Sequence, residues 1–197
     1  MIDEASLLTA VIVVCATGYA TDWKPRWHMV GRNGVDLRKE WDTDPVSYIS
    51  VGAADMPNYF TVLGPNAVVA HGSIIEAMNW TSDYMVKWLR KMATEDIKSF
   101  CPKTKCVEDY VRYGSSIQSR MVWMAGCRSW FKRNTVDGRN VAAFPGSAIF
   151  FRWLISEIRG EDFDIEYRSD NMWWFFGNGF TDYELDATND LAWYVDK

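Results

Sequence analysis

The first glycine of the chain, Gly18, closes an apolar, strand-like segment at residues 11–19. A dinucleotide is gripped by a Gly-x-Gly-x-x-Gly turn between a strand and a helix, because the missing side chains let backbone amides approach the pyrophosphate. No glycine precedes Gly18, and the sole Gly-x-Gly, at residues 177–179, lacks the third glycine and a following helical pattern. The sequence therefore predicts that this chain holds no dinucleotide cofactor by itself.

Composition restricts the class of protein further. With 197 residues, 48% of them hydrophobic, the chain can bury the core of one domain. A net charge of -5 and scattered basic residues argue against nucleic acid as a partner, because phosphate neutralisation needs clustered Lys and Arg. The apolar stretch at residues 5–16 follows Asp3 and Glu4, where a signal peptide is positive, and is too short to span a bilayer. We therefore expect a cytoplasmic protein with no membrane partner.

Metal-ligating residues are sparse. The chain has two histidines and four cysteines, and only Cys101 and Cys106 are close in sequence. Their spacing does not match the paired cysteines of a zinc site. We expect reduced thiols and no bound metal.

Hydrophobic periodicity divides the chain into three parts: residues 1–70 are rich in strands and loops, 71–160 are helical, and 161–197 hold strands and a tail. Ser73 and Glu76 form a capping-box pattern at the start of the longest helix. No repeat or linker interrupts the chain, which predicts a single compact α+β domain of short strands with three main helices. Strands are predicted at 11–19, 47–52, 58–63, 162–168 and 172–176, and helices at 73–93, 107–124 and 147–158.

Eight short motifs follow one another along the chain. They are Ala16-Thr17-Gly18-Tyr19, Gly31-Arg32-Asn33-Gly34-Val35-Asp36-Leu37, Met56-Pro57-Asn58-Tyr59-Phe60, Gly64-Pro65-Asn66, His71-Gly72-Ser73, Cys127-Arg128-Ser129-Trp130-Phe131-Lys132, Phe144-Pro145-Gly146-Ser147 and Gly177-Asn178-Gly179. Each is weak alone. The ordered set resembles the C-terminal part of flavin-dependent Baeyer–Villiger monooxygenases, over nearly the whole chain.

The resemblance implies an enzyme in which FAD forms a peroxyflavin and NADPH is both reductant and structural partner. This chain lacks both dinucleotide-binding glycine motifs of that family and the fingerprint motif between them. Where the family tends to carry Glu-x-Gln, this chain has residues 79–81, Asn-Trp-Thr. Because the cofactor carries oxygen activation, we expect a truncated remnant of a two-dinucleotide-binding flavoprotein fold that does not act as a monooxygenase alone.

Two residues are candidates for catalysis. His71 precedes a predicted helix N-terminus, where the helix dipole favours a neutral imidazole that can exchange hydrogen bonds. The resemblance places Trp130 beside the nicotinamide in family members. For both residues a structural role in the architecture or the core is the alternative interpretation.

The aromatic content, 15% of the residues, indicates a rigid-walled pocket for a bulky apolar ligand. For each aromatic side chain taken singly, packing in the core is the alternative. The predicted pocket residues are Trp80, Tyr84, Trp123, Arg128 and Ser129.

Two functions are compatible with these observations. The first is a cofactor-independent cyclase or isomerase, including an intramolecular Diels–Alderase, that folds a bulky apolar natural-product intermediate into a reactive conformer. The second is a non-catalytic binding module or subunit that completes a separate flavoprotein monooxygenase. The missing nucleotide domains would leave an apolar face exposed, and such a face favours binding to a partner. The partner would be that flavoprotein or a second copy of the chain in a homodimer.

Overall fold

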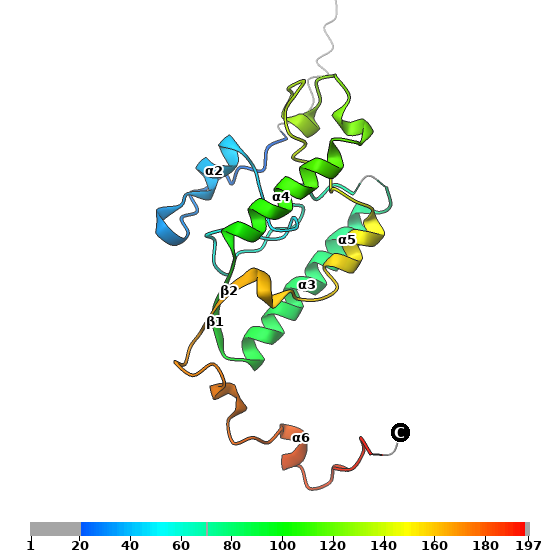
Figure 1. Cartoon of the computed structure of the whole chain (residues 1–197). Coiled ribbons are helices and arrows are strands. Elements are labelled where there is room, and N and C mark those ends of the chain that lie inside the picture. The colour runs from blue at the N-terminus through cyan, green and yellow to red at the C-terminus, as the bar shows by residue number, and fades with distance from the viewer. Residues whose placement is uncertain (1–20, 70, 196–197) are drawn as a thin grey trace, which may run out of the picture.

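The computed structural model describes residues 21–69 and 71–195 and is an α+β protein (Figure 1). The predicted fold class is confirmed. The predicted strand at residues 11–19, with Gly18, lies outside the described residues. The elements are η1 (Arg32–Gly34), α2 (Leu37–Thr43), α3 (Ile74–Thr94), β1 (Ile97–Pro102), α4 (Thr104–Gln118), η2 (Val122–Met124), η3 (Trp130–Lys132), α5 (Ala148–Leu154), η4 (Gly160–Asp162), β2 (Phe163–Tyr167), η5 (Trp174–Phe176) and α6 (Asp182–Leu185).

Helix α3 is the longest element and begins where the sequence predicts. The Oγ atom of Ser73 accepts a hydrogen bond from the backbone N–H of Glu76, 3.4 Å away, which satisfies one free amide of the first turn. Its buried residues recur at helical spacing and form one face that packs against the core. They are Ala77, Thr81, Tyr84 and Trp88.

Strands β1 and β2 form a two-stranded antiparallel sheet beside α3, although α4 and α5 separate them in the chain. The predicted strand at 162–168 is confirmed as β2, whereas β1 was not predicted. The ring of Trp88, fully buried, stacks on Phe100 of β1 at 4.1 Å and packs on Phe163 of β2 at 4.6 Å. These three rings join the long helix to the sheet at the centre of the core.

Helix α4 differs at both ends from the predicted helix at 107–124. It begins earlier, at Thr104, and ends at Gln118, whose buried amide donates to the carbonyl oxygen of Ala143. Gly114 lies inside the helix because a Cβ atom there would meet the ring of Pro145 at 3.0 Å. A glycine that costs helix propensity is kept here by close packing.

Three further predictions about the central elements are wrong. Helix α5 ends at Leu154 rather than near residue 158, so Gly160 is not its C′ residue. The predicted strand at 47–52 is a tight turn, in which Ile49 and Ser50 have φ of 38° and 69°. The predicted strand at 58–63 is irregular and runs beside β1, where the backbone N–H of Asn58 donates to the carbonyl of Phe100. Local β propensity is overridden because residues 47–52 bond within their own turn, as in the Val51 N–H to the carbonyl of Tyr48, and residues 58–63 meet β1 through the backbone N–H of Asn58 without forming a ladder.

Asp162 fastens the start of β2 to the core. Its Oδ2 atom accepts from the Tyr48 hydroxyl at 2.7 Å and from the Arg159 Nε at 2.8 Å. Burial raises the pKa of this carboxyl, but the hydrogen bonds from Arg159 and Tyr48 outweigh burial, so the net pKa lies below the ordinary value.

A carboxylate with a lowered folded-state pKa stabilises the protein above its unfolded pKa and loses that contribution as the pH falls through the folded value. We expect the wild type to have a higher free energy of unfolding than Asp162→Asn at about pH 5, and this difference to shrink as the pH is lowered to about 2. Urea unfolding of both proteins at the two pH values measures the difference. A difference that stays constant or widens contradicts the role given to the carboxylate.

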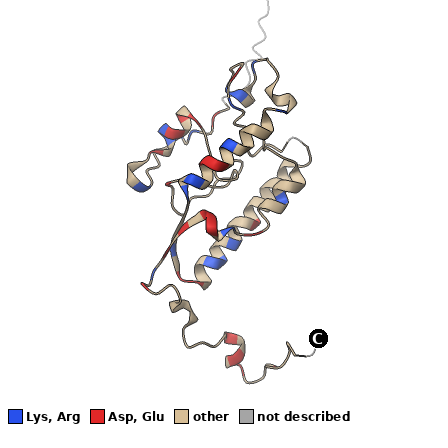
Figure 2. Ribbon diagram, viewed as in Figure 1, with Lys and Arg blue, Asp and Glu red and all other residues tan. Residues whose placement is uncertain are grey.

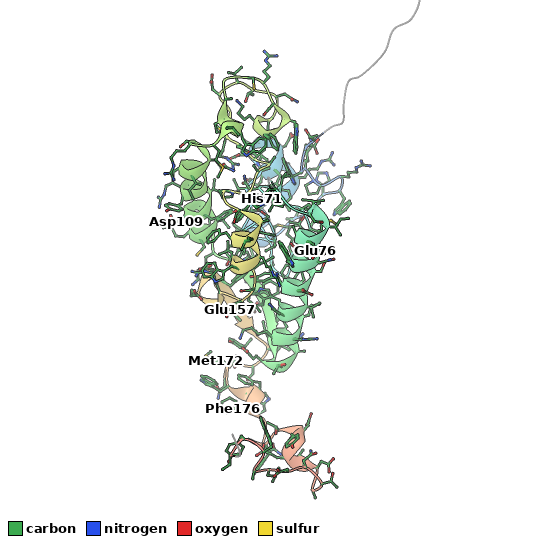
Figure 3. The ribbon with its side chains drawn as sticks, turned by 90° about the vertical axis from the view of Figure 1, so that its right-hand side faces the viewer. His71, Glu76, Asp109, Glu157, Met172 and Phe176 are labelled. Atoms are coloured by element: carbon green, nitrogen blue, oxygen red, sulfur yellow. The ribbon has the colours of Figure 1, made fainter. Side chains whose placement is uncertain are left out.

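Beyond β2 the chain forms an arm, residues 169–195, that extends away from the body (Figure 1). The strand predicted at 172–176 is wrong: this segment turns into the 3₁₀-helix η5, and the side chains of Met172 and Phe176 point into solvent (Figure 3). No β-strand of the described chain lies beside it to pair with its backbone. Within residues 21–69 and 71–195, none of the helices is long and apolar enough to cross a membrane.

Candidate functional site

The head loop, residues 119–140, carries four of the seven predicted site residues. In it Trp130 stacks on Phe131 with ring centroids 4.4 Å apart, and Trp123 packs edge-on against Phe131 at 5.1 Å. Trp130 is 38% exposed, so one face of this cluster is open to solvent. Such a cluster presents a rigid apolar surface at the end of the molecule.

A buried lysine holds the head loop closed. The side chain of Lys132 is 1% exposed, and its Nζ donates to the carbonyl oxygens of Ala125 at 2.7 Å and Val136 at 2.6 Å. A backbone bridge between Ser129 and Thr135 closes the same turn. Because both carbonyls face a buried cation, the lysine fixes the backbone on either side of Trp130.

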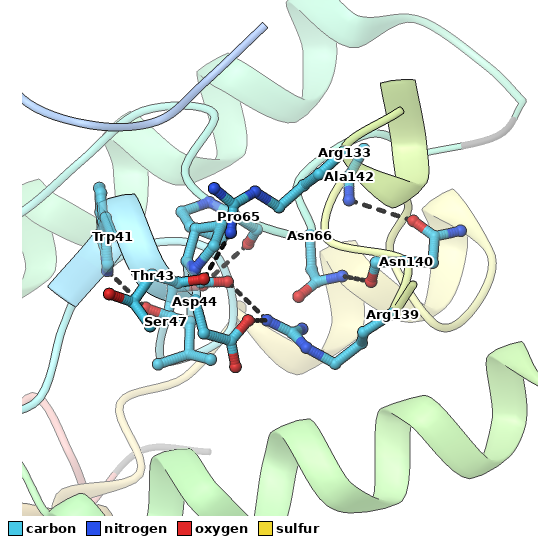
Figure 4. A network of polar contacts seen from close by, with 12 residues as sticks. Trp41, Thr43, Asp44, Ser47, Pro65, Asn66, Arg133, Arg139, Asn140 and Ala142 are labelled. Atoms are coloured by element: carbon cyan, nitrogen blue, oxygen red, sulfur yellow. Dashed lines mark hydrogen bonds and ion pairs between the residues drawn. The ribbon is translucent and has the colours of Figure 1, made fainter. Parts of the chain in front are cut away.

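A polar network fastens the head loop to the body (Figure 4). The amide of Asn66 donates to the carbonyls of Asn140 at 2.9 Å and Ala143 at 3.0 Å, so it bridges the loop and the core. Arg139 binds Asp44 at 2.5 Å and the carbonyl of Pro45 at 2.8 Å. Arg133 donates to the carbonyls of Asp42 and Thr43 at the end of α2.

Arg128 and Ser129 directly precede the exposed tryptophan in the chain. Arg128 is exposed and makes no ion pair with any residue in the described part of the chain. The Oγ atom of Ser129 is buried and has no hydrogen-bond partner there. The exposed groups next to each other in this loop are therefore the Arg128 guanidinium and the Trp130 ring, while the Ser129 hydroxyl lies beneath the surface.

The other three predicted residues lie elsewhere, on or before α3. His71 is exposed just before the helix (Figure 3). Tyr84 is 1% exposed in the core, and burial raises its pKa to about 12. Trp80 is half-buried, with Arg152 Cζ 5.6 Å from its ring centroid, and lines a shallow pocket of about 190 Å³ between α3 and α5. Their assignment to one site with the head loop stays a prediction.

A cavity of about 450 Å³ lies between α2 and α4, and none of the seven predicted residues lines it. Its wall includes Leu37 and Trp41, two buried residues four apart on α2. The sequence signal for α2 is the capping residue Asp36 followed by this apolar pair at i and i+4. Helix α2 was not predicted, because it lies in the part of the chain predicted as strands and loops.

The described residues do not fit the pyrophosphate of a dinucleotide. Gly177 and Gly179 have positive φ, 56° and 82°, and lie on the exposed arm, where a Cβ atom in place of either glycine hydrogen would meet only open space. The next helix, α6, has four residues and does not follow a strand. A phosphate-binding turn needs a strand before it and a helix N-terminus after it. In residues 21–69 and 71–195 no three His, Cys, Asp or Glu side chains group as a metal site requires.

Comparison with known sequences defines the class of protein. The chain is similar to the FAD-binding monooxygenase tazF of Aspergillus terreus, with 39% identity over 186 residues, and to stcW of Emericella nidulans, with 36% identity over 169 residues. It is also 33% identical over 144 residues to a Baeyer–Villiger monooxygenase of Pseudomonas aeruginosa. These matches cover 93%, 86% and 72% of the chain but 33%, 28% and 27% of the relatives. No family model matches the chain.

Comparison with solved structures shows a similar fold in part of two monooxygenases. Cyclohexanone monooxygenase from Rhodococcus sp. Phi1, bound to NADP+, superposes with a TM-score of 0.62 at 21% identity over 71% of this chain and 27% of that one. An oxidized steroid monooxygenase bound to NADP gives the same TM-score at 20% identity. The predicted resemblance to part of the flavin-dependent Baeyer–Villiger monooxygenases is therefore confirmed. The chain spans about a third of the length of the curated relatives.

Proposed function

We propose that this chain is a module of a flavin-dependent monooxygenase and completes that enzyme by packing against its dinucleotide-binding part. The chain corresponds to about a third of relatives named FAD-binding monooxygenases. The glycine turns that grip FAD and NADPH are absent from its sequence. Flavin chemistry therefore has to come from the remaining two thirds of such an enzyme.

The arm is the observation that carries this proposal. Eleven large aromatic and aliphatic side chains of the arm are exposed to solvent. An exposed apolar surface of this kind is unfavourable in water and marks a site where another structure binds. The match to tazF covers 93% of the chain, so it extends into the arm, which holds residues 169–195 of 197. The exposed large side chains of the arm are Met172, Trp173, Trp174, Phe176, Phe180, Tyr183, Leu185, Leu191, Trp193, Tyr194 and Val195.

Charge gives the chemistry of the surface that the arm contacts. Residues 169–195 contain five acidic and no basic residues, and α6 carries two of the acids (Figure 2). Hydrogen bonds from Thr181 and Thr188 lower the pKa values of Glu184 and Asp186, so both are charged at neutral pH. We expect the contacted surface to be apolar with a basic rim.

Reconstitution tests the module. The dinucleotide-binding part of tazF, expressed without the third that this chain matches, is loaded with FAD and mixed with this chain or with tazF's own third as a positive control. We expect NADPH-dependent oxygenation to appear only in the mixtures. A chain ending at Arg168 lacks the arm, and we expect it to restore an oxygenation rate about tenfold or more below that of the full chain. Equal activity without the arm contradicts the proposal.

A homodimer is the other way to cover the arm. Light scattering of the chain alone distinguishes the two. If the chain is a module of the flavoprotein, we expect the chain alone to be a monomer or a weakly self-associating species. In the mixture we then expect one copy of the chain per flavoprotein. A tight dimer that does not exchange into the flavoprotein complex assigns the arm to a second copy.

A cofactor-independent cyclase or isomerase is the second candidate, and the α2–α4 cavity favours it. Its volume of about 450 Å³ suits a compact apolar intermediate. His71 and Trp130, proposed for catalysis, do not line this cavity. We expect a cyclase to convert its substrate, including by an intramolecular Diels–Alder reaction, without FAD or NADPH. Loss of turnover in His71→Ala or Trp130→Ala would place the chemistry at these two residues and outside the cavity. Unchanged turnover in both variants would exclude them as catalytic residues.

A further inference from the structure

The α2–α4 cavity has a wall of mostly apolar side chains. Leu37 and Trp41 come from α2, Val107 and Val111 from α4, and Ala53 from the loop that follows α2. Four of these five residues are nearly fully buried, so the wall is fixed by the core rather than by mobile side chains. The Trp41 indole N–H donates to the carbonyl of Val46 at 2.8 Å, which holds the ring in place.

The charged groups around this cavity are not balanced. Arg112 Nη2 contacts Asp109 Oδ1 at 2.5 Å, and Arg139 Nη2 contacts Asp44 Oδ1 at the same distance, so each guanidinium is already paired. The remaining carboxylates make no ion pair with any residue of the described ranges. They are Glu40, Asp55 and Glu108.

An apolar wall beneath an excess of carboxylates selects a ligand of defined chemistry. An anionic ligand is repelled by the three carboxylates, and a neutral apolar ligand gains nothing from them. A hydrated metal ion gains nothing from the apolar wall. A molecule with an apolar body and one cationic nitrogen satisfies both features at once.

We propose that the α2–α4 cavity binds an organic monocation, a compact aromatic or aliphatic group that carries one ammonium. The apolar body occupies the space between Leu37 and Val107, and the ammonium lies at the mouth near Glu40 and Glu108. The cavity volume of about 450 Å³ limits the body to a small molecule. This site does not depend on the proposed docking to a flavoprotein.

Three probes of equal shape test the site on the full chain. They are 4-phenylbutylamine, the neutral 4-phenylbutanol and the anionic 5-phenylpentanoate, each titrated calorimetrically at low ionic strength. We expect the amine to bind about tenfold more tightly than the alcohol, the carboxylate to bind more weakly than either, and added salt to reduce the difference. Equal affinities, or no binding of any probe, overturn the proposal.

Two variants locate the binding. Glu40→Gln with Glu108→Gln removes two exposed carboxylates, and we expect amine affinity to fall about fivefold while alcohol affinity stays unchanged. Ala54→Phe fills the cavity, because Ala54 is half-buried in its wall, and should abolish binding of all three probes. Asp83→Asn on α3 is the matched control and changes neither affinity. A cavity-filled variant that melts like the wild type yet binds the amine equally well overturns the assignment.

Discussion

Trp88→Ala is expected to lower the free energy of unfolding by about 3–5 kcal/mol, the largest effect of any single substitution in the core. The Trp88 ring is fully buried and touches the rings of both strands, Phe100 at 4.1 Å and Phe163 at 4.6 Å. Removing it leaves a void that neither strand fills, because the two strands are held in place by the backbone hydrogen bonds between them. Urea unfolding followed by circular dichroism measures the change.

Trp153→Ala on α5 is the control for this prediction. Its ring is 67% exposed and stacks only on Phe150, so we expect a change within about 0.5 kcal/mol. Equal destabilisation by the two variants contradicts the assignment of Trp88 to the centre of the core.

Lys132→Met is expected to cost about 2–4 kcal/mol and to loosen the head loop. Methionine has nearly the same shape, but it cannot donate to the carbonyls of Ala125 and Val136, so the two bonds of 2.7 Å and 2.6 Å are lost. A hydrogen bond from a charged donor contributes more to stability than one between neutral groups. Faster amide hydrogen exchange at residues 125–136 reports the local opening.

Lys39→Met on α2 provides the matched control, because that lysine is exposed and makes no ion pair with a described residue. We expect no measurable change in stability or exchange. If Lys132→Met leaves hydrogen exchange of the head loop unchanged, the lysine does not fix the backbone around Trp130.

The elements with strong local signals were predicted correctly from the sequence. The capped start of α3 at Ser73 and the alternation of β2 are written in neighbouring residues, so periodicity finds them. Strand β1 was missed because its residues are almost all buried and show no alternation. The segments at 47–52 and 58–63 have β-rich composition, but positive φ at Ile49 and Leu63 bends them out of any strand.

The site was predicted only where its residues are adjacent in sequence. Arg128, Ser129 and Trp130 come together because they share one loop. Their placement relative to His71 and Tyr84 depends on tertiary packing, which no local pattern encodes. The α2–α4 cavity was missed for the same reason: its walls come from α2, the following loop and α4, and its lining residues range from Val35 to Arg112.

Co-elution of flavin with this chain tests the central claim most directly. The FAD-loaded dinucleotide-binding part of tazF is passed through a sizing column alone, with this chain, and with the chain ending at Arg168. We predict that flavin absorbance shifts to a one-to-one complex with the full chain and does not shift with the shortened one. Two results would contradict the account. One is flavin bound by this chain on its own; the other is a flavin absorbance peak that tazF's own third shifts but the full chain does not.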